Sequence, residues 1–156
     1  MKKVMLAIAL WAQVLLRLLM GFMWTSTGRV WLRADDPGGR VLEVIELSIE
    51  RGTTSGVYRS FLESVVAPNT DLFATFATIG ELAVGASLFL GLGTRLGVAG
   101  ALFLALNYSL TIRFGLFPPS GNMGVFLVNA LLLIGTPGRR LGLDRLLVKR
   151  WPEYRL

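Results

Sequence analysis

Apolar residues of this chain are gathered in four long, nearly uncharged stretches rather than spread evenly. They cover residues 4–27, 72–94, 96–112 and 123–136. A helix that crosses a hydrocarbon layer of about 30 Å needs about 20 apolar residues. The first two stretches reach this length alone, and the other two reach it with a few flanking residues. The pattern therefore predicts transmembrane helices at about 4–27, 71–93, 95–114 and 121–136.

Residues 28–70, between the first two stretches, differ from the rest of the chain in holding many acidic and basic side chains. Residues 36–39 are Asp-Pro-Gly-Gly, which is typical of a turn. Apolar residues then recur at helical spacing in 41–50 and again in 57–66. We predict an extramembrane loop over 28–70 whose two short amphipathic helices lie on the membrane surface or cap the bundle. A loosely ordered polar loop is the alternative interpretation of the same residues.

Short connections and a basic tail complete the predicted architecture. The link Gly93-Thr94 is so short that the second and third helices must be antiparallel neighbours. The expected fold class is all-α: an integral membrane four-helix bundle, forming a single transmembrane domain over residues 1–156, with short amphipathic helices in the helix 1–2 loop and at the C-terminus. The tail, 139–156, is expected to hold an interfacial helix marked by Leu141, Leu143, Leu146 and Leu147, with Trp151 and Tyr154 at the headgroup level.

Composition supports a membrane location. The chain has 156 residues, of which 53% are hydrophobic, and its mean hydropathy is +0.60. So short a soluble chain could hardly enclose that much apolar surface in a core. Lys2-Lys3 followed by an apolar run resembles a secretory signal peptide, but Arg17 interrupts the run and no A-x-A cleavage site follows. We therefore expect a retained first helix.

Charge orients the predicted bundle. The formal net charge is +6, from 16 basic and 10 acidic residues. Because the cations flank apolar segments, we expect anionic lipid headgroups as their partners and no nucleic acid. The positive-inside rule places both termini in the cytoplasm of a multi-pass plasma (inner) membrane protein. The cations that decide this side are Lys2, Lys3, Arg95, Arg139, Arg140, Arg145, Lys149, Arg150 and Arg155.

The chain contains neither cysteine nor histidine. Their absence excludes disulfides, thiol chemistry, structural zinc and histidine-ligated haem or copper within this chain. We expect no metal site. Any redox chemistry must therefore use an organic cofactor such as a quinone, or a metal that a partner holds.

Each predicted transmembrane helix carries one strongly polar side chain: Arg17, Glu81, Asn107 and Asn129. Counted from the outer helix ends at ~1.5 Å per residue, Arg17 lies ~14 Å deep and Glu81 ~15 Å deep. The two amides come to ~11 Å and ~10 Å. Because an unpaired charge at this depth costs about 2.5–3.5 kcal/mol on insertion scales, we hypothesise an ion pair between Arg17 and Glu81.

Two interpretations of this intramembrane polar cluster remain open. Polar side chains hydrogen-bond helices together in lipid, so the cluster could serve helix packing alone. Alternatively, it forms a binding site for a polar headgroup such as a quinone, or a proton route. Gln13 and Tyr108 would extend the cluster under either interpretation.

Three segments resemble a known family. Residues 17–22 (RLLMGF) are similar to an R-L-L-x-G-x pattern, and residues 80–85 (GELAVG), continued by GLGTR at 91–95, are similar to G-E-L-x-x-G…L-G-L-x-T-R. Residues 138–144 (GRRLGLD) resemble G-R-x-x-G-x-D. These patterns, in this order, resemble the DoxX/DoxD family of small four-helix membrane proteins. The extended loop is closer to the DoxD branch, which is associated with the membrane subunit of thiosulfate:quinone oxidoreductase.

The chain departs from the family at residues 28–32, where Gly-Arg-Val-Trp-Leu replaces the usual G-x-x-K-L. Arg29 or Arg33 would have to replace the missing lysine. The resemblance implies a membrane subunit of a redox complex that contributes to quinone binding or proton transfer, with other membrane subunits or a redox protein as partners. A non-catalytic accessory or assembly subunit is the alternative, and solute permeation is a third class. The sequence assigns no catalytic residue and does not decide whether the protein is an enzyme.

Overall fold

The structure is a computed structural model of the chain, and it describes residues 2–54, 56–111, 121–134 and 141–150. Within these ranges the regular elements are all helical, which confirms the predicted all-α class. In chain order they are α1 (Lys2–Leu32), α2 (Pro37–Glu50), α3 (Gly56–Phe61), the π-helix η1 (Leu62–Val66), the 3₁₀-helix η2 (Ala67–Asn69), α4 (Thr70–Leu90), α5 (Thr94–Thr111), α6 (Gly121–Ile134) and α8 (Leu143–Arg150).

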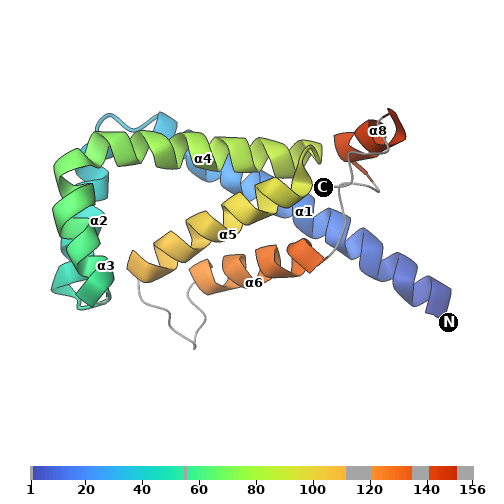
Figure 1. Cartoon of the computed structure of the whole chain (residues 1–156), viewed down its shortest axis with the longest axis horizontal. Helices are drawn as coiled ribbons and strands as arrows, with labels where there is room; N and C mark the ends of the chain where they lie inside the picture. The colour runs from blue at the N-terminus through green and yellow to red at the C-terminus, as the bar shows by residue number, and fades with distance from the viewer. Residues whose placement is uncertain (1, 55, 112–120, 135–140, 151–156) are drawn as a thin grey trace.

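Four helices pack in a ring. α1 contacts α4, α4 contacts α5, α5 contacts α6, and α6 contacts α1. Figure 1 shows α4 and α5 with α1 behind them and α6 beside α5, while α2 and α3 lie across one end. We call α2, α3 and η1, residues 37–66, the cap. The two short helices expected between the first two apolar stretches are therefore present, and the alternative of a loosely ordered loop is wrong.

The outer surface of these helices is strongly apolar. Two helical runs, Ala7–Leu32 and Gly56–Leu90, are long and apolar enough to cross a membrane, and Gly124–Ile134 is a shorter apolar helix. Large hydrophobic side chains are exposed on every helix of the ring, among them Ile8, Phe22, Phe76, Phe103 and Leu131. Lipid would cover such side chains, so these features indicate a membrane protein.

Helix α1 is longer than the sequence predicts. The expectation that it ends near Thr27 is wrong, because the helix continues to Leu32. Thr25 and Thr27 donate hydroxyl hydrogen bonds of 2.8 and 3.0 Å to the carbonyls of Gly21 and Met23, one turn back. These bonds satisfy the polar side chains within the helix, so they do not interrupt it.

Glycines let α1 and α4 approach each other closely. A Cβ atom at Gly21 would lie 2.6 Å from the backbone nitrogen of Phe89, and one at Gly85 would lie 2.6 Å from that of Thr25. Small residues of this kind are typical of helix contacts in membranes. The pairing also fixes the antiparallel register, because residues 21 and 25 lie beside residues 89 and 85. Glu81 therefore belongs beside the C-terminal part of α1.

Candidate functional site

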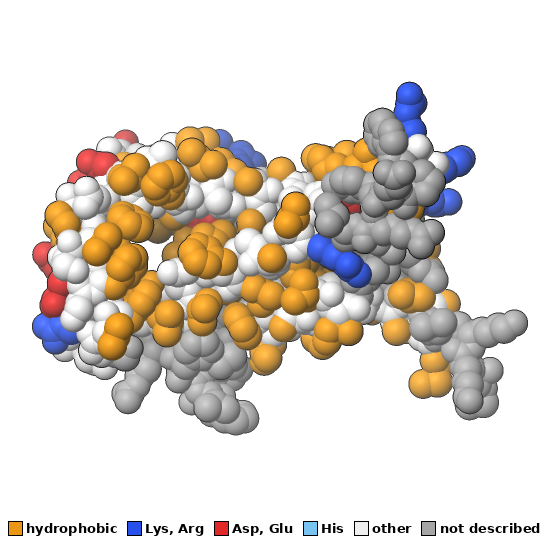
Figure 2. Space-filling view, viewed as in Figure 1, with side chains coloured by type: hydrophobic (Ala, Val, Ile, Leu, Met, Phe, Trp, Pro, Cys, Tyr) orange, Lys and Arg blue, Asp and Glu red, His pale blue; other side chains and the backbone are white. Residues whose placement is uncertain are grey.

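A cavity of about 430 Å³ lies between the cap, α4 and α5. Aromatic and aliphatic side chains line it, and none of the described residues that line it is charged. Figure 2 shows this hollow, edged with hydrophobic side chains, on one face of the molecule. Its size and its apolar walls are typical of a small-molecule site. We call it the cap cavity.

Tyr108 of α5 connects the cap cavity to the buried carboxylate of Glu81. The Tyr108 side chain lines the cavity, and its hydroxyl donates a hydrogen bond to Glu81 Oε1. Glu81 is completely buried, and within the described part of the chain its Oε2 atom has no hydrogen-bond partner. Trp24 of α1 stacks on Tyr108 with a centroid distance of 6.4 Å. A phenol in the cavity wall is thus held in contact with a buried acid.

Asn107, the neighbour of Tyr108, binds the cap instead. Its Oδ1 atom accepts a hydrogen bond of 3.0 Å from the Tyr58 hydroxyl, and its Nδ2 atom donates one of 2.8 Å to the Phe103 carbonyl. Thr53 adds a second link, because its hydroxyl donates a bond of 3.0 Å to the Thr111 carbonyl. These two contacts attach the cap to the end of α5 and so close the cap cavity at this end.

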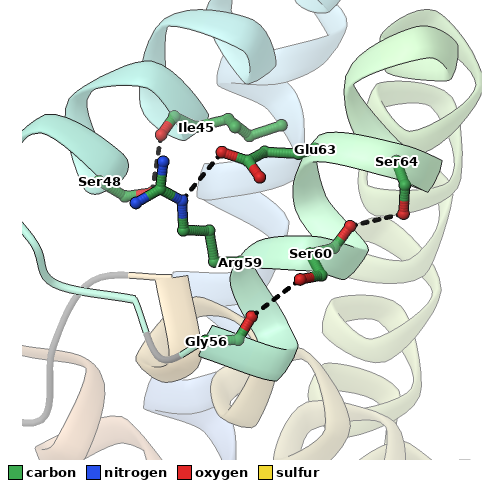
Figure 3. Close-up of polar contacts among 7 residues, drawn as sticks. All are labelled: Ile45, Ser48, Gly56, Arg59, Ser60, Glu63 and Ser64. Carbon is green, nitrogen blue, oxygen red and sulfur yellow. Dashed lines mark hydrogen bonds and ion pairs between the residues drawn. The ribbon is translucent and has the colours of Figure 1, made fainter.

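Polar contacts within the cap are local to its own helices (Figure 3). The Ser60 hydroxyl donates to the Gly56 carbonyl, and the Ser48 hydroxyl donates to the Ile45 carbonyl. Arg59 and Glu63 form an ion pair of 2.9 Å in which both side chains are about half exposed. An exposed pair contributes about 1 kcal/mol at most. The cap is held mainly by apolar packing of Ile45, Leu62 and Val66 against their neighbours.

Arg17 lies at the opposite end of the bundle, and the expected ion pair with Glu81 is not formed. Arg17 is 1% exposed, and its Nε and Nη1 atoms have no hydrogen-bond partner among the residues that the structure describes. Its guanidinium packs against the backbone of Gly91 and interacts electrostatically with Asp144. The equal depths inferred from the sequence were wrong because α1 extends to Leu32, so Arg17 lies deeper than a helix end near Thr27 implied.

Asp144, at the start of α8, is a polar residue that sequence reasoning missed. Its carboxylate accepts hydrogen bonds from the backbone N–H groups of Gly93 and Thr94, at 2.7 and 3.0 Å, and from the Thr94 hydroxyl, at 2.7 Å. Its own N–H donates to the Gly91 carbonyl at 2.8 Å. Asp144 thereby caps the N-terminus of α5, where a carboxylate is favoured. The motif at 138–144 contained this residue but gave no sign of its partner.

For the other predicted site residues, the structure describes no contact with Glu81. Asn129 is completely buried on α6, where its Nδ2 atom donates to the Val125 carbonyl and lies 3.9 Å from Met20 Sδ. Gln13 is partly buried with an unpartnered Oε1 atom, and Arg29 is exposed. The structure therefore brings together Glu81 and Tyr108, and it places the remaining members elsewhere.

Two buried polar atoms at or beside this pair have no partner among the described residues. These are Glu81 Oε2 itself and Nε1 of Trp24, which stacks on Tyr108. Each such atom costs about 1–3 kcal/mol, so their retention favours a role in binding a polar group or a proton. In the described part of the chain, no group of three or more acidic residues is arranged to hold a metal ion.

Comparisons with known proteins give one match. The family model described as "TQO small subunit DoxD" matches residues 12–156. No curated protein and no solved structure matches the chain.

Proposed function

This chain belongs to the DoxD family, and on that premise we propose that it is a membrane subunit of a thiosulfate:quinone oxidoreductase complex whose cap cavity binds the quinone ring. The single observation that carries the proposal is the Tyr108–Glu81 hydrogen bond, which joins the wall of an apolar cavity to a buried carboxylate. A quinone needs both features, because its ring is flat and apolar while its oxygens require hydrogen-bonding groups.

The residues around the cap cavity suit such a ring. Phe61, Phe73 and Phe103 offer aromatic surface against which it can pack. Tyr108 and Asn107 place a hydroxyl and an amide at the same wall. A bound quinone would accept electrons and protons there. Because the chain has no cysteine or histidine, the electrons are supplied by a partner subunit.

The role of Glu81 in this proposal is to hold and exchange a proton. Tyr108 lines the cavity and its hydroxyl bonds Glu81 Oε1, so, once Glu81 carries a proton on Oε1, the phenol can give its own proton to a cavity ligand and take the carboxyl proton in exchange. The unpartnered Oε2 atom leaves room for Glu81 to be protonated in turn. General acid–base transfer of this kind contributes about 100-fold or more to rate.

We further propose that α1, α4, α5 and α6 each cross the membrane. Both termini and α8 then lie on the cytoplasmic side, where the positive-inside rule places the dense cations of the sequence. The cap lies on the outer side, and α2 packs on α4. This arrangement puts the cap cavity in the outer half of the bilayer, at the end of the bundle remote from Arg17.

A non-catalytic assembly role is the second candidate, and the surface of α1 favours it. Val4, Ile8 and Trp11 are each more than half exposed, and they share one apolar face near the start of the helix. A membrane helix of a partner subunit would pack well on such a face. This role is compatible with the first, since a quinone site fed by a partner requires that partner to be bound.

Replacing Glu81 by Gln tests the proposal, because it keeps the shape and removes the exchangeable charge. The complex would be purified in mild detergent with its partner subunits, and reduction of an added quinone would be followed. We expect the rate to fall about 100-fold or more. Glu63→Gln is the matched control, because Glu63 is exposed on the cap. Unchanged quinone reduction in Glu81→Gln would remove the main support for the site.

Co-purification with the same complex tests the assembly role separately. Under the proposal, Glu81→Gln keeps its partner subunits while losing turnover. A wild-type chain that elutes as a lone monodisperse monomer would contradict both candidates.

A further inference from the structure

The walls of the cap cavity are not equally closed. At its outer end, Ile45 and Leu62 of the cap are 3% and 4% exposed, and the bonds from Tyr58 and Thr53 fix the cap to α5. On its side, Phe76 of α4 and Phe103 of α5 line the same cavity, yet they are 61% and 66% exposed. Val44 and Phe61 of the cap also line the cavity and are 38% and 37% exposed, well below the two phenylalanines of α4 and α5. The cavity is therefore more exposed between these two helices of the ring than on its cap side.

The surroundings of the open side are apolar. Leu72 and Ile79 on α4 and Leu106 on α5 are exposed hydrophobic neighbours of the two rim phenylalanines along their helices. Figure 2 shows the hollow opening onto this hydrophobic face of the molecule. In a membrane-embedded bundle such a face meets acyl chains, because exposed side chains of this type are not stable in contact with water.

We propose that the gap between Phe76 and Phe103 is a lateral portal through which the ligand enters from the bilayer, and that its hydrophobic tail stays in this portal while its ring reaches Tyr108. This inference rests on the proposed function and adds the ligand class and the route. The site selects a ring with a long apolar tail over a water-soluble ring, since only the former is concentrated in the lipid at the portal. A polar metabolite arriving from the aqueous side would have to displace the cap.

The absence of cysteine from the chain provides a direct test. Single cysteines are introduced at the rim as Phe103→Cys and, in a second protein, Phe76→Cys. Phe89→Cys is the matched lipid-facing control, because Phe89 is 52% exposed on α4 and does not line the cavity. Val57→Cys is the control on the cap surface, where Val57 is 89% exposed. The complex is placed in phosphatidylcholine vesicles and modified with a membrane-soluble maleimide.

Two probes are compared: a fully substituted benzoquinone with a ten-carbon tail, and the same ring with a methyl group in place of the tail; full substitution leaves no free ring carbon to which the cysteine thiols could add. We expect the tailed probe to slow modification of both rim cysteines severalfold and to leave Phe89→Cys and Val57→Cys unchanged. The tail-less probe should protect neither rim position. Having two rim variants keeps the test valid if one of them fails to fold.

Occupancy of the cavity is measured independently by the fluorescence of Trp31, which lines it. The Trp31 signal is the difference between the wild type and Trp31→Phe. Saturable quenching by the tailed probe without protection of the rim cysteines, or with protection of Val57→Cys, would overturn the portal and leave quinone binding intact. No saturable quenching by either probe would overturn the proposed function together with the portal.

Discussion

The two ends of the bundle each bury a charged side chain, but they accommodate it in opposite ways. At one end Asp144 receives three hydrogen bonds from the start of α5, and Arg17 packs against the Gly91 backbone. At the other end Glu81 bonds one described side chain, Tyr108, which lines a 430 Å³ cavity. Arg17 keeps two N–H groups without a partner among the described residues, but its charge is compensated by the nearby opposite charge of Asp144. Glu81 has only a neutral phenol as its described partner, and that phenol belongs to the wall of a cavity, as is typical of a group that serves binding. We therefore assign the Arg17 end to structure and the Glu81 end to function.

The largest effect on this comparison is expected from Asp144→Ala. It removes three hydrogen bonds to a carboxylate, and a hydrogen bond to a charged group contributes about 1.5–3 kcal/mol. It also removes the negative charge that acts on Arg17. The apparent melting temperature of the purified protein in detergent should fall strongly, while the folded fraction still binds quinone. Asp36→Ala is the control, because Asp36 caps the exposed start of α2 and its loss costs about 1 kcal/mol. An equal loss in both variants would contradict a structural role for the Arg17 end.

Gly91→Ala is expected to come next. Gly91 has a φ of +65°, and a Cβ there would collide with the Arg17 guanidinium and lie 2.8 Å from the Gly142 Cα. Gly93→Ala is a close control, since Gly93 has a φ of +58° but open space around it. Both variants lose about 1–2 kcal/mol of stability because alanine must adopt a left-handed conformation. Only Gly91→Ala also creates a steric collision. Thermal unfolding should rank Gly91→Ala clearly below Gly93→Ala, and the reverse order would refute the tight packing of Arg17.

Tyr108→Phe tests the other end. It removes the one hydrogen bond to Glu81, which leaves the buried carboxyl group unpartnered and costs about 1–3 kcal/mol. We expect quinone reduction to fall far more than the stability does, because the ring is retained and only the hydroxyl is lost. Steady-state rates and melting curves on the same preparation measure both. If the quinone reduction rate falls only as much as the loss of stability explains, the Tyr108 hydroxyl has a packing role and no role in proton transfer.

The smallest effect is expected from Arg59→Ala. The Arg59–Glu63 pair is exposed on the cap, and such pairs contribute about 0.2–1 kcal/mol. Neither the melting temperature nor the quinone affinity should change measurably. A marked loss of quinone affinity would show that the cap is held over the cavity by this pair and not by the packing of Ile45 and Leu62.

Hydrophobic patterning predicted the helices well, because the described part of each long apolar stretch lies mainly in one helix and the cap helices follow their amphipathic spacing. The depths of the polar residues along the helix axes were predicted less well. Depth was counted from an assumed helix end near Thr27, but α1 continues past Thr25 and Thr27, whose hydroxyls bond back to their own helix, and ends at Leu32. An error of one helical turn or more separates two side chains that the count had placed together.

The hydrophobic pattern could not predict contacts between segments that are distant in the sequence. Asn107 and Tyr108 are adjacent in sequence, yet one bonds Tyr58 of the cap and the other bonds Glu81 of α4. Which of the two faces the carboxylate depends on how α4 and α5 are rotated against each other. Asp144 illustrates the same limit, because its partners lie about 50 residues earlier in the chain and are backbone groups. Almost every residue carries a backbone N–H donor, so the residue types in the sequence do not reveal which of these donors bind a carboxylate.

Photo-crosslinking with an azido-substituted quinone that carries a ten-carbon tail tests the functional assignment of the two ends most directly. The complex in membranes would be irradiated, digested and analysed by peptide mass spectrometry, with excess unmodified quinone as competitor. Competable labels are predicted on peptides that include residues 58–77 and 103–111, which form the cap cavity, and not on those around Arg17 or in α8. Competable labelling confined to the Arg17 end, or none at all, would contradict the account.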